Sequence, residues 1–268
     1  SPGGLPWPSW AHDQLLGGNR MRTTLIRGEA GRVDRALNET ADLKVTERLL
    51  EQVANNPEMG GLVRIYRPAP TVAFSGRERR LPGFRAAVGE SLAFSFEPVI
   101  RSAGGRMVAL DPDWIVMDII TPEPDRRDNR QVYLEHGQAL VEVLNELGVQ
   151  AALGPVPLEY CPGDYSINAR GQVKIVGTAQ RVRRGVRLFS ISIPHSISVN
   201  VREMFTRANE LLGLEWNPST LGSIQAENPE VTIDQLETAL IQRFAGSAEA
   251  EIALADVFAQ TQQVELAG

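Results

Sequence analysis

The sequence predicts an α+β fold in which a mixed, largely antiparallel sheet is flanked by helices. Segments with strand-like composition follow one another through tight turns, while segments with helical periodicity lie before, between and after them. Regular strand–helix alternation is absent, and the sequence contains neither the GxGxxG nor the GxxxxGK[ST] motif of nucleotide-binding folds. A mixed sheet with helices on its faces is consistent with all of these observations.

The first half of the chain is expected to hold two helices among five strands. Apolar residues recur at four-residue steps between positions 33 and 55, which is typical of an amphipathic helix. The stretch GLVRIYRP has the composition of a strand that ends at Pro68, because proline lacks the amide hydrogen of a sheet ladder. The other elements are expected as strands over residues 71–74, 94–101, 107–110 and 114–121, and as a short helix over residues 86–92.

The second half is expected to begin with a helix and to continue with a strand meander. Residues 130–147 carry an apolar stripe, and Gly148 marks the end of this helix. Three β-like runs follow, and Gly171 and a later Arg-Arg-Gly sequence supply the turns between them. These runs cover residues 165–169, 173–180 and 186–193. Helices are then expected over residues 202–212, 233–244 and 250–260.

The chain is expected to hold one catalytic domain with an extension at each end. Residues 1–20 are rich in glycine, proline and tryptophan and have no sustained period, so they form an N-terminal extension, with Met21 as a native start. The alternative is an arm that packs through Trp7 and Trp10. Residues 21–230 are assigned to the catalytic domain, and residues 231–268 to a C-terminal helical segment packed on it.

Composition excludes several classes of protein. Hydrophobic residues make up 43% of the 268 residues, which argues against global disorder, and the net charge of −6 argues against a general nucleic-acid binder. There is no apolar run near the roughly 20 residues that span a bilayer, and no signal peptide. We therefore expect a cytoplasmic protein without membrane or nucleic-acid partners. The single cysteine, Cys161, excludes an internal disulfide framework.

A glycine pair follows the strand expected at residues 94–101, in the sequence RSAGGR that begins at Arg101. Without a Cβ, Gly104 and Gly105 let the backbone approach a ligand closely. Their amides could bind a carbonyl or phosphate oxygen, and Arg101 would add positive charge. The alternative is an ordinary glycine turn with a surface arginine.

Cys161 lies in a loop, because Pro162 and Gly163 follow it directly before an expected strand. A thiol in such a place can be both exposed and held. The thiolate is the reactive form, so a nucleophilic role requires a nearby cation or helix N-terminus that lowers the thiol pKa. The alternative is an inert, half-buried cysteine.

Lys174 stands between apolar residues on an expected strand. Alternation places Lys174 and Val176 on one face of this strand, and Val173 and Ile175 on the other. A lysine in this position lies either at a solvated sheet edge or in a cleft. In a cleft it could polarise a thioester carbonyl or stabilise the oxyanion formed during acyl transfer.

Three segments in this order resemble the superfamily of lipoate–protein ligases and octanoyltransferases. A strand ending in R-x-x-G-G-R, followed by an acidic turn and a second strand, resembles its lipoyl-binding signature. The run VKIVGTAQR resembles its K-x-x-G-x-A-Q segment, whose lysine contacts the acyl carbonyl. Cys161, thirteen residues before Lys174, is near the place of the catalytic cysteine of the Gram-positive octanoyl amidotransferases, the branch it resembles most. The likeness is clearest over residues 64–189.

The resemblance implies a biotin/lipoate protein ligase catalytic-domain fold and an acyltransferase. Cys161 would carry an octanoyl or lipoyl group as a thioester, and Lys174, with amides near Gly177, would hold the carbonyl. The implied partners are acyl carrier protein and lipoyl-carrier domains, namely the glycine cleavage H protein and E2 subunits. No metal or cofactor is required. The residues that the resemblance assigns to substrate binding are Arg101, Gly104, Gly105, Gly177, Thr178, Ala179 and Gln180.

The sequence departs from the family pattern at two places. Leu110 stands where many members have histidine, and Pro162-Gly163 follows the cysteine where the amidotransferases more often have phenylalanine. No separate accessory domain of the kind found in many lipoate ligases is evident, which favours a transferase. Most of the three acidic residues near the motifs, Asp111, Asp118 and Asp164, are interpreted as turn or surface groups. None is assigned a catalytic role, and the alternative for Asp164, three residues from Cys161, is that it orients the incoming amine.

Other functions remain open at this stage. An ATP-dependent lipoate or octanoate ligase would need ATP and Mg²⁺ and would hold an acyl-adenylate at Gly104, Gly105 and Lys174. A non-catalytic acyl-binding paralogue would keep the pocket without turnover, and a biotin ligase is a more remote alternative. The sequence does not predict the donor and acceptor carriers, the choice between octanoyl and lipoyl groups, or the oligomeric state.

Overall fold

The computed structural model describes residues 22–28, 41–248 and 250–258. Its centre is an eight-stranded sheet in the order β11-β1-β2-β6-β10-β9-β8-β7. In chain order these strands are β1 (Thr23–Arg27), β2 (Gly61–Tyr66), β6 (Trp114–Glu123), β7 (Ala151–Leu153), β8 (Ile167–Ala169), β9 (Val173–Arg183), β10 (Gly185–Pro194) and β11 (Ala250–Ile252). The pairs from β2 to β7 are antiparallel, whereas β1 runs parallel to both β2 and β11. The predicted mixed, largely antiparallel sheet is confirmed.

A second, three-stranded sheet lies beside the first and has the order β4-β3-β5. Its strands are β3 (Thr71–Phe74), β4 (Glu97–Ile100) and β5 (Val108–Leu110). The α-helices are α2 (Asp42–Asn55), α3 (Phe84–Ala93), α4 (Asn129–Glu146), α5 (Val199–Leu212), α6 (Ile224–Glu227) and α7 (Ile233–Ala245). Short 3-10 helices cover Pro57–Met59, Glu78–Arg80 and Pro218–Thr220.

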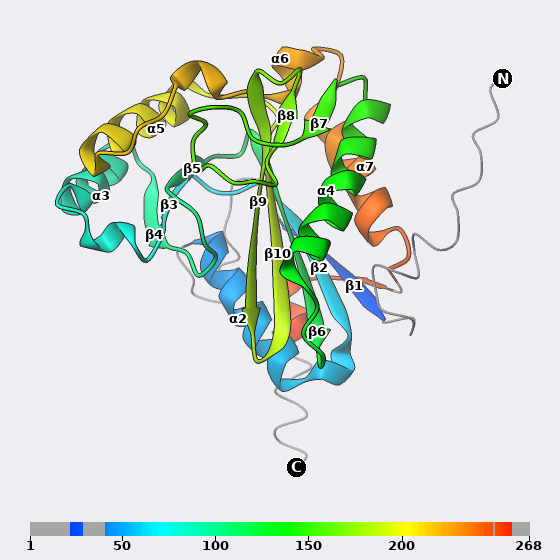
Figure 1. Ribbon diagram of the computed structural model, residues 1–268. Helices are drawn as coiled ribbons and strands as arrows, with labels where there is room; N and C mark the ends of the chain where they lie inside the picture. Colours follow the sequence, from blue (N-terminus) through cyan, green and yellow to red (C-terminus); the bar gives the residue numbers. More distant parts are fainter. Residues whose placement is uncertain (1–21, 29–40, 249, 259–268) are drawn as a thin grey trace.

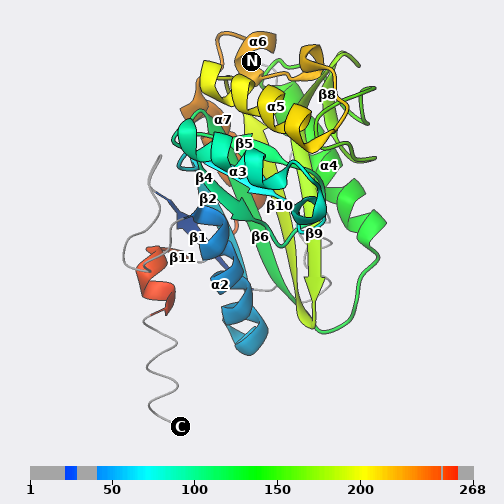
Figure 2. The ribbon, with the colours of Figure 1, turned by 90° about the vertical axis from the view of Figure 1, so that its left-hand side faces the viewer.

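The helices cover both faces of the large sheet (Figure 1). On one face α4 and α7 pack over a core that includes Ile115 and Met117 of β6. On the other face α2 packs over Ile120 of β6 and Leu188 of β10. Figure 2 shows α3 and α5 beside each other next to the small sheet. The alternation of apolar side chains along β6 therefore supplies both cores, as expected for a strand buried on both faces.

Polar caps and a glycine set the ends of the main helices. Ser198 accepts a hydrogen bond from the amide of Val201 at the start of α5, and Gly213 ends this helix with a left-handed φ of +66°. Thr232 and Gln235 form a capping box at the start of α7. These local signals explain why the predicted bounds of both helices are close to those observed.

Most expected elements are present, and the β8-β9-β10 meander is confirmed. The expected helix over residues 33–55 corresponds to α2, and its first residues fall in 29–40, outside the described ranges. The helix expected over residues 250–260 is wrong at its start, because Ala250–Ile252 form β11 and pair with β1; residues 254–258 are helical. Strands β1 and β7 were not predicted.

The terminal extension of residues 1–20, with both of its tryptophans, lies outside the described residues, and the proposed domain bounds stay a prediction. Within residues 22–28, 41–248 and 250–258, no helix is long and apolar enough to cross a bilayer.

Candidate active site

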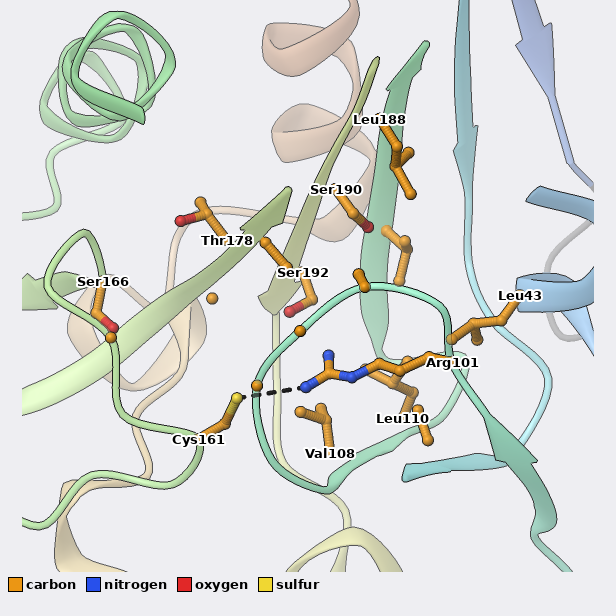
Figure 3. Close-up of a pocket in the computed structure, with 18 of the residues that line it drawn as sticks. Leu43, Arg101, Val108, Leu110, Cys161, Ser166, Thr178, Leu188, Ser190 and Ser192 are labelled. Atoms are coloured by element: carbon orange, nitrogen blue, oxygen red, sulfur yellow. Dashed lines mark hydrogen bonds between the residues drawn. The ribbon is translucent and has the colours of Figure 1, made fainter. Parts of the chain in front are cut away.

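A cavity of about 320 Å³ lies over the face of the large sheet that α2 covers. Its walls come from the loop between β4 and β5, the loop between β7 and β8, helix α2, and strands β6, β9 and β10 (Figure 3). All but one of the residues predicted from sequence line this cavity. They are Arg101, Gly104, Gly105, Cys161, Lys174, Gly177, Thr178 and Ala179.

The Cys161 thiol is held between two donors of the β4–β5 loop. The Arg101 guanidinium donates to Sγ from 3.4 Å, and the amide of Arg106 donates to it from 3.1 Å. Arg101 is itself fixed, because its Nη2 also donates to the carbonyl of Arg106 at 2.5 Å. The alternative of an ordinary glycine turn with a surface arginine therefore does not agree with the structure.

Gly105 makes this contact between the two loops possible. Its φ is +105°, and a Cβ at this position would lie 2.7 Å from the Cys161 sulfur and 2.6 Å from Nη2 of Arg101. Such distances are closer than any ordinary contact, so a side chain at this position would displace Cys161 and Arg101, and the positive φ also favours glycine. Cys161 itself has a φ of +43°, an uncommon conformation for a residue with a side chain, and one that often occurs at functional sites.

The surroundings of Cys161 favour its thiolate. Burial alone would raise the pKa of the thiol, but the positive charges of Arg101 and Lys174 and the hydrogen bond from the Arg106 amide outweigh burial. The net result is a pKa below the ordinary value for cysteine. Because the thiolate is the nucleophile, these are the conditions that a reactive cysteine requires.

Lys174 lies in the cleft and not at a sheet edge, since its side chain is 2% exposed. Its ammonium group donates to the carbonyls of Cys161 at 2.8 Å and Tyr160 at 3.0 Å, and to Glu159 at 3.3 Å. Burial lowers the pKa of Lys174, while the charges of Cys161 and Glu159 raise it. All three ammonium protons are used to hold the cysteine loop in this structure.

A bulge in β9 gives Lys174 this orientation. Val176 pairs with Ile167 and Lys174 pairs with Asn168, so Ile175 is an extra residue between two paired positions. Ile175 and Val176 both pack in the core under α4. The prediction that Lys174 and Val176 share one face is therefore wrong, because simple alternation fails at a bulge.

Glu159 was not identified from the sequence, yet it organises the whole cysteine loop. One of its carboxylate oxygens accepts from the Ser166 hydroxyl at 2.5 Å, from the Gly163 amide at 3.2 Å and from Lys174. The other oxygen accepts from the Val156 amide at 3.0 Å. Glu159 is 1% exposed, and a buried carboxylate needs such partners. The wall of the cavity on the side of Cys161 is thus held by a network of hydrogen bonds.

The opposite wall of the cavity is mostly apolar. Leu43, Val108, Leu110, Val116 and Leu188 line it and offer a slot for an aliphatic chain. Leu110, the position where histidine was expected, contributes to this slot. The amides of Gly104 and Gly105 have no hydrogen-bond partner among the described residues and are available to a ligand.

Two sequence interpretations do not agree with the structure. The side chain of Gln180 lies away from the cavity, where it donates to the carbonyl of Asn129 at 2.8 Å and accepts from Arg187. Asp118 is not a turn or surface group, because it is 1% exposed in the middle of β6 and lines the cavity. Asp111 is buried as well and accepts from Ser198 at 2.6 Å, whereas Asp164 is exposed at the rim of the cavity.

Among the described residues, no group of three or more histidine, cysteine, aspartate or glutamate side chains is arranged to hold a metal ion. The expectation that no metal or cofactor is required stays a prediction.

Comparison with known families gives one match over most of the chain. The model of the lipoyl protein ligase A/B catalytic domain matches residues 39–245. Proteins named octanoyl-GcvH:protein N-octanoyltransferase are similar over shorter stretches. The protein from an Exiguobacterium species is 27% identical over 132 residues, which cover 49% of this chain and 47% of that protein. The Oceanobacillus iheyensis protein is 20% identical over 220 residues, 77% of this chain and 74% of that protein.

Solved structures share the fold. The bipartite lipoate protein ligase of Thermoplasma acidophilum, described with its E2 lipoyl domain, has a TM-score of 0.62 at 17% identity and covers 88% of this chain and 91% of that one. A lipoate-protein ligase A bound with ATP has a TM-score of 0.60 at 18% identity, with coverages of 88% and 92%. At these identities the likeness shows the fold alone. The chain spans about half the length of the first two octanoyltransferase relatives.

Proposed function

Because the chain belongs to the lipoyl protein ligase A/B catalytic-domain family, we propose that it moves an octanoyl group onto a lipoyl-domain lysine through a thioester on Cys161. The observation that carries the proposal is the thiol itself. It lies at an apolar cavity between Arg101 and the amide of Arg106, with its pKa lowered. A structural cysteine needs none of these contacts.

The reaction would proceed in two halves. The Cys161 thiolate attacks the carbonyl carbon of the donor and forms a carbon–sulfur bond, the bond from that carbon to the donor carrier breaks, and the carrier takes a proton from solvent and leaves as its free thiol or amine. The amine of the acceptor lysine then attacks the thioester, loses a proton to solvent and releases the Cys161 thiolate. The charge that develops on the carbonyl oxygen needs donors at both stages.

Two sets of groups can meet that need. The amides of Gly104 and Gly105 have no partner among the described residues, and Gly105 lies next to the thiol, since a Cβ on Gly105 would touch its sulfur. Lys174 supplies positive charge to the site, and it would bind the oxyanion directly only by releasing the carbonyl of Cys161. We assign Lys174 first to holding the loop and second to stabilising the thiolate.

The names of the relatives suggest the partners. Their named donor is octanoyl-GcvH, so we propose the glycine cleavage H protein as donor and an E2 lipoyl domain as acceptor for this chain. Acyl carrier protein remains an alternative donor. The proposal includes a cytoplasmic location, as the sequence predicts.

Transfer between purified carriers tests this function. Octanoylated H protein and an unmodified E2 lipoyl domain are incubated with the enzyme in the absence of ATP, and the mass of each carrier is followed. We expect octanoyl transfer by the wild-type protein. The transfer rate should fall more than about 100-fold in the Cys161→Ser variant, since a serine hydroxyl is a far weaker nucleophile than a thiolate. Octanoate-dependent exchange of pyrophosphate into ATP, with transfer only when ATP is present, would instead assign the chain as a ligase.

A further inference from the structure

A row of polar side chains crosses the floor of the cavity beside its apolar wall. Strand pairing places Asp118 of β6 directly between Arg64 of β2 and Ser190 of β10. The Ser190 hydroxyl donates to one Asp118 oxygen at 2.6 Å, and the Thr46 hydroxyl of α2 donates to the other at 2.5 Å. The row is therefore a built hydrogen-bonding cluster.

This polar row faces the ligand space. Thr46, Asp118 and Ser190 all line the cavity, and Asp118 is 1% exposed. The neighbouring positions are apolar, and Figure 3 shows Leu188 and Leu43 on either side of the space next to Ser190. An acyl chain in the slot would thus have a carboxylate beside it, inside a wall that is otherwise suited to methylene groups.

The row lies well away from the reacting carbon. Ser192 of β10 pairs with Gly177 of β9, and Gly177 lies next to Lys174, since a Cβ on Gly177 would be 3.7 Å from Cε of Lys174. The position of Ser192 therefore marks the end of the cavity at which Lys174 lies. Ser190 comes two residues before Ser192 on β10, and this spacing corresponds to roughly 7 Å at the usual rise of a strand. A ligand group that meets Asp118 must therefore belong to the chain and not to the thioester.

Holding α2 to the sheet does not require Asp118. Arg64 already forms a buried ion pair with Asp42 of α2 at 2.7 Å, and Val45 and Leu49 of α2 pack in the core on the same face. Each Asp118 oxygen accepts one hydrogen bond and keeps a second lone pair. A purely aliphatic chain beside Asp118 would leave this remaining acceptor capacity unused, whereas a hydrogen-bond donor on the chain would fill it.

We propose that the cavity selects an acyl group with a hydrogen-bond donor on the distal part of its chain, such as a hydroxyl group, and that Asp118 binds this donor. The inference rests on the proposed function, because it takes the acyl chain to occupy this cavity. It adds a substrate class, a hydroxylated medium-chain acyl group, that a plain octanoyl transferase does not require. An N–H on a ring at the end of the chain has the same chemistry.

Direct binding tests the inference without any need for turnover. The affinity of the wild-type protein is measured by calorimetry for octanoate, for 4-, 6- and 8-hydroxyoctanoate, and for biotin as the ring N–H probe. We expect one hydroxyoctanoate to bind about tenfold or more tightly than octanoate, as a hydrogen bond to a charged group predicts. If biotin binds more tightly than octanoate by the same factor, this would also support binding of a hydrogen-bond donor by Asp118, and the donor would then be a ring N–H. Equal affinities across the series, or tightest binding of octanoate, would overturn the inference.

Variants at matched positions assign the preference. Asp118→Asn should reduce the preference for the hydroxylated acid to less than about threefold, because the charge that strengthens the hydrogen bond is gone. Ser192→Ala, on the same face of β10 but outside the polar row, should keep it. A preference that survives Asp118→Asn would contradict the role of Asp118, and the wild-type series decides the matter if the variant does not fold. Loss of ATP-independent transfer with the ligand preference intact would refute only the proposed reaction.

Discussion

Replacing Gly105 by alanine tests how tightly the structure positions the Cys161 thiol. The new Cβ would start 2.7 Å from the sulfur and 2.6 Å from Nη2 of Arg101, whereas ordinary contact begins at 3.4 Å. Both groups must therefore retreat by about 0.7–0.8 Å. The positive φ adds strain of about 1–2 kcal/mol for any residue with a side chain.

This retreat would weaken both hydrogen bonds that stabilise the thiolate. We expect the pKa of Cys161 to rise, because the thiolate loses part of the two hydrogen bonds that favour it. The rate of alkylation at neutral pH should then fall roughly 10- to 100-fold, with a similar loss in acyl transfer. Because the chain has one cysteine, the pH dependence of its reaction with iodoacetamide reports on Cys161 alone.

Gly104→Ala is the matched control for this measurement. No atom lies within 4 Å of a Cβ at Gly104, and its φ is not in the positive range. Its alkylation profile should therefore match that of the wild-type protein. An unchanged profile for Gly105→Ala, or an equal shift in Gly104→Ala, would refute the steric argument.

Three further variants test the electrostatics of the fold. Arg101→Met removes the cation 3.4 Å from the Cys161 sulfur, so the pH midpoint of alkylation should rise; an unchanged midpoint would contradict this role. Glu159→Gln removes a charge that raises the pKa of Lys174, so the alkaline limb of the transfer pH–rate profile should move to lower pH, and urea unfolding should show a loss of about 1–3 kcal/mol. If the alkaline limb of the pH–rate profile does not move, Glu159 does not influence the pKa of Lys174 in the working enzyme. Burial lowers the pKa of His136 from its ordinary 6.5 to about 4, so as the pH falls below 6.5 the unfolded chain binds the proton first. Stability should drop by up to about 3 kcal/mol by pH 4, and this component of the drop should vanish in His136→Gln; identical pH dependence in both proteins would argue against a buried neutral histidine.

The sequence identifies residues that meet at the cavity because their signals are local. A glycine pair after a strand, a cysteine in a Pro-Gly loop and a lysine within a β-run are each visible in a few neighbouring residues. Their order along the chain then indicates the family, and the structure brings Arg101, Cys161 and Lys174 together.

The features that were missed depend on distant partners. Glu159 acquires its role only when Lys174 folds against it, and the bulge at Ile175 depends on pairing with β8. Strand β11 pairs with β1, more than 200 residues earlier, and its own three residues carry no strand pattern. Asp118 is different, since an aspartate alternating with Val116 and Ile120 in an apolar run was a signal that sequence reasoning could have used.

The most direct measurement of the central claim is the intact mass of the protein after incubation with an octanoyl-loaded carrier in the absence of ATP. The thioester route predicts an added octanoyl group on the wild-type protein that neutral hydroxylamine removes. It predicts no such hydroxylamine-sensitive adduct on Cys161→Ser. Transfer to an acceptor domain at the wild-type rate by Cys161→Ser, or transfer by the wild-type protein without any acyl-enzyme under conditions that trap one, would contradict the account.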